Sequence, residues 1–198
     1  SASVACERFA FFLLLSLLLL YLGERFGFTT ANATDLLGCF IAVSYVSPLL
    51  GGIVADGRIG VVRVASLGYL AAALGYALLM VQNVPTLYAG LLLVAIGSGM
   101  AKSAPQTLAV RLYRNAPTQQ DEGLTFIYLL ANASAIVSPV VGEAARRWLG
   151  WSAAFALASL GLLTAWAVIR SQRSLLHAAK QLPCPPDETG SHDKPGSL

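Results

Sequence analysis

The sequence predicts an all-α membrane protein with six transmembrane helices arranged as three plus three. Of its 198 residues, 56% are hydrophobic and only 12% are charged, whereas a soluble domain carries about 25% charged residues. The mean hydropathy is +0.66. Six apolar runs follow one another along the chain, and each approaches the roughly 20 residues that a helix needs to cross the hydrocarbon core. Short loops between the runs favour antiparallel neighbours within one bundle.

The first three spans are expected at residues 1–22, 33–54 and 62–81. The first contains the almost unbroken apolar run from Phe9 to Leu22. The second contains Pro48, which a membrane helix tolerates because neighbouring groups satisfy the carbonyl that proline frees. The third lies between two polar breaks, and the pattern ends before Asn83.

The last three spans are expected at residues 86–112, 122–144 and 152–169. The fourth contains the small residues Gly97-Ser98-Gly99, which allow a neighbouring helix to approach closely. The fifth contains Pro139, and Gly150 separates it from the sixth. Tryptophans next to this last break, Trp148 and Trp151, are expected to anchor the chain at the membrane surface.

The chain divides into a bundle at residues 1–172 and a polar tail at residues 173–198. The tail is rich in Pro, Gly, Ser and charge, a composition typical of a disordered linker. With the N-terminus placed in the cytoplasm, the inner loops and the tail hold Arg58, Arg63, Arg111, Arg114, Arg170, Arg173, Lys180 and Lys194, and the outer loops hold only Arg25, Arg146 and Arg147. This excess favours a multi-pass protein of the cell (inner) membrane with a cytoplasmic N-terminus and tail.

Several classes of function are not expected. The three cysteines, Cys6, Cys39 and Cys184, lack the spacing of a metal site or a disulfide framework, so we expect no metal and no cofactor. No nucleophile with a base and an orienting group is visible, which argues against an enzyme. The net charge of +3 comes from scattered basic residues, and this pattern is not that of a nucleic-acid-binding protein.

Glu7 and Arg8 stand at the head of the first apolar run. A charged group in hydrocarbon costs about 2.5–3.5 kcal/mol on insertion scales, so such residues usually face a bundle interior or a wet cavity. Because neighbouring residues of a helix point in different directions, we expect each to meet a partner on another helix. The carboxylate could accept a proton. The alternative is that both side chains extend to the inner membrane surface.

Lys102 is a second charge within an apolar run, at a depth comparable with that of Glu7. A buried ammonium can exchange a proton with a carboxylate or bind the carboxylate of a substrate. The alternatives are a structural salt bridge and extension to the membrane surface. In the fifth span, Tyr128 and Asn132 are four residues apart and share a helix face, which suits either a polar solute or a hydrogen-bonded pair between helices.

The loop after the second span combines glycines with charge. Gly51 and Gly52 allow close approach and a tight turn. Asp56 can accept backbone N–H groups at a helix start. Arg58 and Arg63 can pair with this carboxylate or with phospholipid.

These motifs together resemble those of the proton-dependent oligopeptide transporter family of the major facilitator superfamily. The first-helix signature of that family is two Glu three apart, then Arg and Phe, and a Tyr three residues after the Phe. Here Glu7, Arg8 and Phe9 match, whereas Val4 and Phe12 replace the first Glu and the Tyr. Further matches are Gly51, Gly52, Ala55, Asp56, Gly60, Arg63, Lys102, Tyr128, Asn132, Ser138-Pro139 and Gly150-Trp151. The resemblance covers all six spans and implies the N-terminal half of a twelve-helix fold.

The resemblance implies proton-coupled uptake of di- and tripeptides by alternating access. It assigns proton coupling and gating to Glu7, Arg8 and Lys102. It assigns peptide binding to Lys102, Tyr128, Asn132 and Phe12, and an inner gate loop to Asp56, Gly60 and Arg63. Because substrate sites in this architecture lie between two halves, it also implies a C-terminal six-helix half or a second chain as partner, besides membrane lipid, small peptides and protons.

Two other interpretations remain open. The chain could be a major facilitator carrier of another cargo, such as drugs, nitrate or sugars. It could also be a truncated membrane protein that does not transport and binds a partner half.

Overall fold

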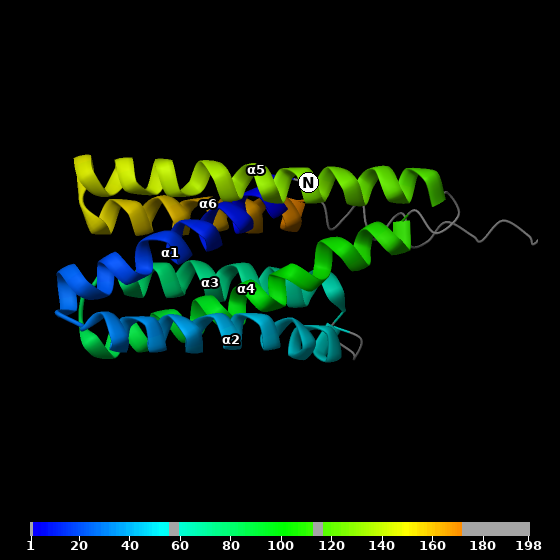
Figure 1. Cartoon of the computed structure of the whole chain (residues 1–198). Coiled ribbons are helices and arrows are strands. Elements are labelled where there is room, and N and C mark those ends of the chain that lie inside the picture. The colour runs from blue at the N-terminus through cyan, green and yellow to red at the C-terminus, as the bar shows by residue number, and fades with distance from the viewer. Residues whose placement is uncertain (1, 56–59, 113–116, 172–198) are drawn as a thin grey trace, which may run out of the picture.

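The computed structural model describes residues 2–55, 60–112 and 117–171, with side chains except at 2, 103–122 and 124. The described part forms six α-helices and contains no strand (Figure 1). They are α1 (Ala2–Phe26), α2 (Thr30–Val54), α3 (Val61–Leu79), α4 (Val84–Leu112), α5 (Pro117–Leu149) and α6 (Trp151–Ser171). Each contains a segment long and apolar enough to cross a membrane, so the prediction of an all-α, multi-pass membrane protein is confirmed. The tail at 173–198 lies outside the described residues.

Most of the helices extend beyond the apolar runs that predicted them, whereas α3 ends at Leu79, two residues before the expected end. The Thr29 hydroxyl accepts a hydrogen bond from Asn32 N at 3.4 Å and caps α2, so this helix begins three residues before Ala33. The largest extension is in α5, which runs to Leu149 because its charged last turn keeps helical geometry through side-chain pairs three and four residues apart. Apolar runs therefore locate the part of each helix within the hydrocarbon and not its full length.

The six helices pack as two interleaved groups of three. The first group is α1 with α5 and α6, and the second is α4 with α2 and α3. Figure 1 shows the first group above the second, and α3 packs on α6 to join them. The division into three plus three therefore does not separate helices 1–3 from helices 4–6. Instead α1 and α4 hold corresponding places, each packed on the two helices that follow the other in sequence.

Glycines bring α3 and α4 into direct backbone contact. A Cβ built on Gly97 would lie 2.5 Å from Ala72 N and 2.6 Å from Gly68 O, and one built on Gly75 would lie 2.7 Å from Gly90 O. Real side chains do not approach this closely, so these positions require glycine. The small residues predicted to allow close approach in the fourth span do so, and they fix α4 against α3.

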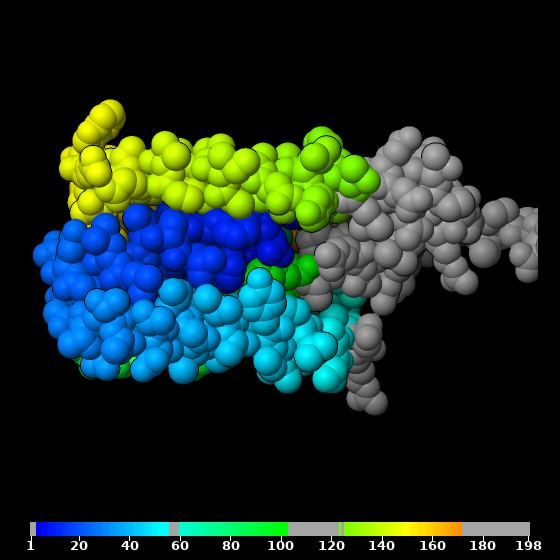
Figure 2. Space-filling model, in the orientation of Figure 1, coloured from blue at the N-terminus to red at the C-terminus, as the bar shows by residue number. Residues whose placement is uncertain are grey.

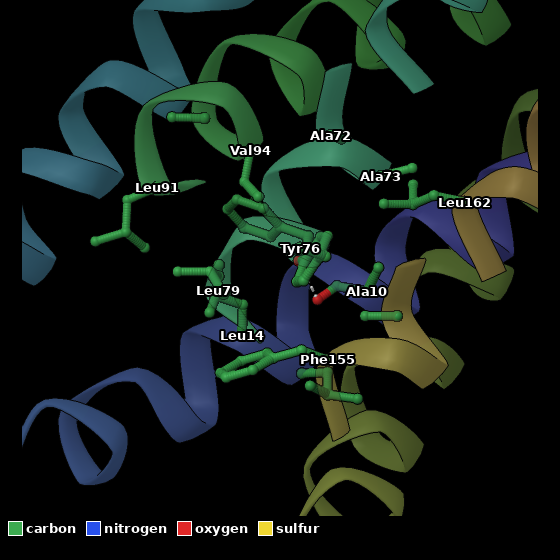
Figure 3. Close-up of a cluster of buried hydrophobic side chains, with 14 of the residues drawn as sticks. Ala10, Leu14, Ala72, Ala73, Tyr76, Leu79, Leu91, Val94, Phe155 and Leu162 are labelled. Carbon is green, nitrogen blue, oxygen red and sulfur yellow. Dashed lines mark hydrogen bonds between the residues drawn. The ribbon is translucent and has the colours of Figure 1, made fainter. Parts of the chain in front are cut away.

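Buried hydroxyls tie the helices together through backbone carbonyls. Tyr76 of α3 donates to Ala10 O of α1 at 2.6 Å, within the apolar cluster that Figure 3 shows. Tyr21 of α1 donates to Leu79 O of α3 at 2.7 Å. In an apolar surrounding an unpaired hydroxyl is costly, and these bonds remove that cost while they set the register of α1 on α3.

The end of the bundle where α5 meets α6 carries an ionic network. Arg146 pairs with Glu143 at 2.8 Å and with Glu24 of α1 at 3.2 Å. Trp151 Nε1 donates to the same Glu24 at 3.2 Å. Both tryptophans were expected to anchor the chain at the membrane surface. Trp148 is 86% exposed, as such an anchor would be. Trp151 is only 5% exposed, because it packs against the rings of Tyr21 and Phe155.

Candidate functional site

A polar cleft opens on the face where α1 lies between α5 and α2 (Figure 2). Its volume is about 610 Å³. Helices α1, α3, α4 and α5 supply its walls, so it lies along the junction of the two helix groups. It is lined by Val4, Glu7, Arg8, Phe12, Tyr69, Ala101, Lys102, Thr125, Ile127, Tyr128, Ala131 and Asn132.

The cleft brings together every residue that the sequence predicted for proton coupling and substrate binding. These are Glu7, Arg8, Phe12, Lys102, Tyr128 and Asn132. They come from three helices and are separated by up to 125 residues of sequence, so the fold assembles them. An adjoining cleft of about 530 Å³ lies between α1, α2 and α4, and it shares Arg8, Phe12 and Lys102 with the first.

The predicted inner gate loop lies elsewhere. Gly60 precedes α3 with a φ of +83°, a conformation that favours glycine. Arg63 is exposed in the first turn of α3, where its backbone N–H bonds Gly60 O at 3.1 Å. Asp56 lies outside the described residues. Neither Gly60 nor Arg63 lines the two clefts.

Glu7 is buried, with 3% of its side chain exposed, and its Oε2 forms an ion pair with Arg8 Nε at 3.1 Å. The expectation that each charge meets a partner on another helix is therefore wrong for this pair. The Arg8 side chain is long enough to reach back to its neighbour although the two Cβ atoms point in different directions. The other oxygen, Glu7 Oε1, is buried without a hydrogen-bond partner. A carboxylate left half satisfied at this depth is costly, so this atom is poised to bind a proton or a donor.

Lys102 presents a cation that forms no ion pair with a carboxylate of the described residues, although the Glu7 carboxylate attracts it electrostatically. Its Nζ lies 3.6 Å from the centroid of the Phe11 ring and 6.0 Å from that of Tyr45. No carboxylate of the described residues lies within 4.0 Å of Nζ, so the structural salt bridge considered for this residue does not form. Aromatic faces partly replace the water that the ammonium lost, and its N–H donors remain available for an anion in the cleft.

Tyr128 and Asn132 share the face of α5 that borders the cleft, as their spacing predicted. The Asn132 amide donates to the Tyr128 carbonyl at 2.8 Å, within one helix. Among the described residues, Tyr128 and Asn132 therefore form no hydrogen bond between helices, which was the alternative. Tyr128 is 69% exposed, and its phenol remains available to a solute.

Three aromatic residues of the site were missed from sequence. Phe11 and Tyr45 lie under the Lys102 ammonium, and Tyr69 lines the cleft with a buried hydroxyl that has no hydrogen-bond partner. Phe11 lies four residues after Glu7, a spacing that places both on one helix face, so this position carried a usable signal. No comparable pattern marks Tyr45 or Tyr69.

The chemistry of the cleft is that of recognition. A cation, a buried carboxylate ion pair, a phenol and an amide line one cleft of about 610 Å³, which suits a small solute that carries both charges. Among the described residues, no group of three His, Cys, Asp or Glu is placed to hold a metal ion.

Comparisons with known proteins point the same way. The family model described as Major Facilitator Superfamily matches residues 1–183. Dipeptide and tripeptide permease A of Escherichia coli is 31% identical over 159 residues, which cover 79% of this chain and 32% of the permease. The permease A of Proteus mirabilis is 31% identical over 163 residues, with 79% and 33% covered. The chain thus spans about a third of the length of these relatives.

Solved structures share the fold. A mutant peptide transporter in complex with alafosfalin superimposes with a TM-score of 0.82 at 23% identity, covering 87% of this chain and 37% of that chain. A bacterial homologue of the human drug peptide transporters gives a TM-score of 0.81 at 25% identity, covering 89% and 40%. These relatives are transporters and not enzymes. The chain therefore belongs to the Major Facilitator Superfamily, and it is similar to peptide permeases and peptide transporters.

Proposed function

We propose that this chain is the N-terminal half of a proton-coupled carrier of di- and tripeptides. The observation that carries the proposal is the Lys102 ammonium, which lies over the Phe11 ring in a cleft that it shares with the buried Glu7–Arg8 ion pair. A peptide is a zwitterion, and a fixed cation with a protonatable carboxyl nearby supplies both functions that symport requires. The curated relatives at about 31% identity are named as di- and tripeptide permeases, which supports this cargo.

In this mechanism Lys102 binds the peptide carboxylate, and Tyr128, Asn132 and Phe12 form the wall along which the peptide lies. Glu7 accepts the transported proton. Protonation removes the negative charge that holds Arg8, so the guanidinium becomes free to turn into the cleft. Arg8 then loses its charge-assisted hydrogen bond to Glu7 and can form one with a group in the cleft. This exchange couples the protonation of Glu7 to the state of the binding site.

A partner closes the cleft and completes the transport cycle. Substrate sites of this architecture lie between two six-helix units, and the cleft opens on the face between α2 and α5. We infer that a C-terminal half or a second chain covers it and that the two units rock to expose the site to either side. In this proposal the N-terminus and the tail lie on the cytoplasmic side of the inner membrane. The inner gate loop is formed by Asp56, Gly60 and Arg63.

Uptake by the assembled carrier, meaning this chain with the six-helix unit that completes it, tests the proposal. Lys102→Ala should weaken peptide binding about 10- to 150-fold, because a hydrogen bond between charged groups contributes about 1.5–3 kcal/mol. Glu7→Gln should abolish uptake driven by a pH gradient and preserve peptide exchange across proteoliposomes without a gradient. The measurement is accumulation of a labelled dipeptide.

Asp35→Asn is the matched control, because it also replaces a carboxylate by an amide, at an exposed residue of α2 that lines neither cleft. It should leave both gradient-driven uptake and exchange near wild type. Wild-type-like uptake by both Lys102→Ala and Glu7→Gln would overturn the site assignment.

A carrier of another cargo is the second candidate. Val4 and Phe12 line the cleft where the family signature has a Glu and a Tyr, so one wall is more apolar than the resemblance implies. Competition of labelled dipeptide uptake by a panel of sugars, nitrate, apolar drugs and tripeptides distinguishes the two. Inhibition by tripeptides alone supports the first candidate, and inhibition by another class with no peptide uptake supports the second.

A further inference from the structure

Two buried oxygens of the cleft have no hydrogen-bond partner in the structure. One is Glu7 Oε1 on α1, and the other is the Tyr69 hydroxyl oxygen on α3. Both residues line the same cleft. The Glu7 side chain is 3% exposed and Tyr69 is fully buried. Buried polar atoms almost always have a partner, so two such atoms in the wall of one cleft, on side chains that interact electrostatically, indicate that a polar group binds there.

A third buried polar group lies at the same position. Ser3 precedes Glu7 by one helical turn, so the two share a face of α1. Ser3 is 8% exposed, and its side chain is the hydrogen-bonding neighbour of Tyr69, at a geometry that still leaves the Tyr69 oxygen able to bind a further group. A carboxylate oxygen, a phenol and a serine hydroxyl provide the two to four partners that an internal water molecule requires.

We propose that Glu7 Oε1 and the Tyr69 hydroxyl together bind one internal water molecule, which makes Tyr69 a positioning residue for the proton-binding carboxyl. The water donates one hydrogen bond to Glu7 Oε1 and accepts another from the Tyr69 hydroxyl. Ser3 supplies the third contact. This arrangement satisfies both orphan atoms without moving the Glu7–Arg8 ion pair.

The water deepens the proposed function, on which it rests. A proton that reaches Glu7 must pass through groups that can both donate and accept, and a water held between a phenol and the carboxylate is such a group. Arg8, as a cation, can only donate. The charged and titratable groups around Glu7 are Arg8 on α1, Tyr69 and Tyr76 on α3, Lys102 on α4 and Tyr128 on α5. Among these, the tyrosines and the carboxyl itself can relay a proton in both directions.

Infrared difference spectroscopy of the assembled carrier in lipid tests the proposal. Acidification should produce a carboxyl C=O stretching band that Glu7→Gln removes. Tyr69→Phe, which keeps the ring, should shift this band because the hydrogen bond to the carboxyl changes. An O–H stretching band that moves in heavy-oxygen water should be present in the wild type and absent in Tyr69→Phe. Ser3→Ala should weaken the same band if Tyr69→Phe does not fold.

Tyr21→Phe is the matched control, since Tyr21 is equally buried and its hydroxyl bonds Leu79 O away from the cleft. It should leave both bands unchanged. In transport, Tyr69→Phe should slow gradient-driven uptake about tenfold and leave exchange without a gradient near wild type, as expected from the loss of roughly one hydrogen bond to a charged group.

The outcomes separate the two proposals. If Glu7→Gln removes the carboxyl band but Tyr69→Phe moves neither band, the water site is wrong and the proton-binding role of Glu7 remains. If no carboxyl band depends on Glu7 and gradient-driven uptake survives Glu7→Gln, the proposed function itself is wrong.

Discussion

Lys102 shows how a single residue can be half-buried and still available. The ammonium lies 3.6 Å from the Phe11 centroid, and cation–π attraction of about 0.5–2 kcal/mol offsets part of the cost of leaving water. A carboxylate partner would have offset more of that cost, but it would also compete with an incoming anion. The aromatic ring therefore holds the cation in place without occupying its hydrogen-bond donors.

Replacing this ring tests its role. Phe11→Leu keeps a buried apolar side chain and removes the π face, so the Lys102 ammonium loses its position. We expect the KM of the assembled carrier for a dipeptide to rise about 2- to 30-fold, which corresponds to the cation–π energy. Initial rates of uptake measure it.

Phe9→Leu is the control, because it is the same change on α1 at a residue that lines neither cleft. An equal rise in KM for Phe9→Leu, or an unchanged KM for Phe11→Leu, would show that the ring does not position the ammonium.

The site residues that sequence revealed are those that are rare in their surroundings. Glu7, Arg8 and Lys102 were recognisable because charges are exceptional within apolar runs. Phe11 and Tyr69 could not be recognised in the same way, because aromatic residues are ordinary in membrane helices. The pairing of Glu7 with Arg8 was also not predictable, since it depends on a side-chain conformation and not on spacing.

Helix contacts depend on the absence of side chains at a few positions. Gly97 of α4 meets Ala72 and Gly68 of α3 at distances that leave no room for a Cβ. Helices in lipid gain little from the hydrophobic effect, so close backbone packing supplies much of their association energy. The register that these glycines set also fixes the position of Lys102, which lies between one and two turns farther along α4.

Gly97→Ala should destabilise the bundle by about 1–3 kcal/mol, the usual cost of overpacking a close-packed interface. Reversible unfolding in detergent, followed by the helical signal, measures the loss. The control is Gly161→Ala in α6, where a built Cβ meets nothing within 4 Å.

At that control position, alanine should stabilise the helix by up to about 1 kcal/mol through its higher helix propensity. If both variants changed stability equally, the proposed close contact between α3 and α4 would be wrong.

At the scale of helices, composition predicted which segments cross the membrane but not how they pair. All six spans and the internal Pro48 and Pro139 are in the described helices as expected. The interleaving of α1 with α5 and α6 was not predicted, because each helix is apolar nearly all round and carries no sequence mark of its neighbours. The partners are instead chosen by small residues and by hydroxyl-to-carbonyl bonds such as that of Tyr76.

The whole molecule consists of two helix groups that are joined firmly away from the cleft. At the end opposite Glu7, the Tyr21 hydroxyl of α1 bonds Leu79 O of α3, and α3 also packs on α6 between the groups. The cleft lies where α4 faces α1 and α5, two helices on which it packs only slightly. A partner unit that covers this face would therefore contact the residues of the substrate site. The tightly packed helix contacts would lie behind these residues.

That arrangement predicts which surface a partner covers. Leu49 of α2 lines the second cleft and is 68% exposed, and Thr125 of α5 lines the first and is also exposed. Leu160 of α6 is 61% exposed but lines neither cleft. Spin labels at Leu49→Cys and Thr125→Cys, in a background without the native cysteines, should lose collisions with oxygen when the completing six-helix unit is present, because protein replaces lipid around them.

The label at Leu160→Cys should keep its collision rate, since α6 belongs to the side that faces lipid in both states. The comparison is made between the chain alone and the assembled carrier in the same lipid. Protection of Leu160→Cys with unchanged exposure at Leu49→Cys and Thr125→Cys would place the partner on the opposite face. The cleft would then open toward lipid in the assembled carrier, and a path for a polar solute through it would be physically excluded, because charged side chains and a zwitterionic peptide cannot be solvated by hydrocarbon.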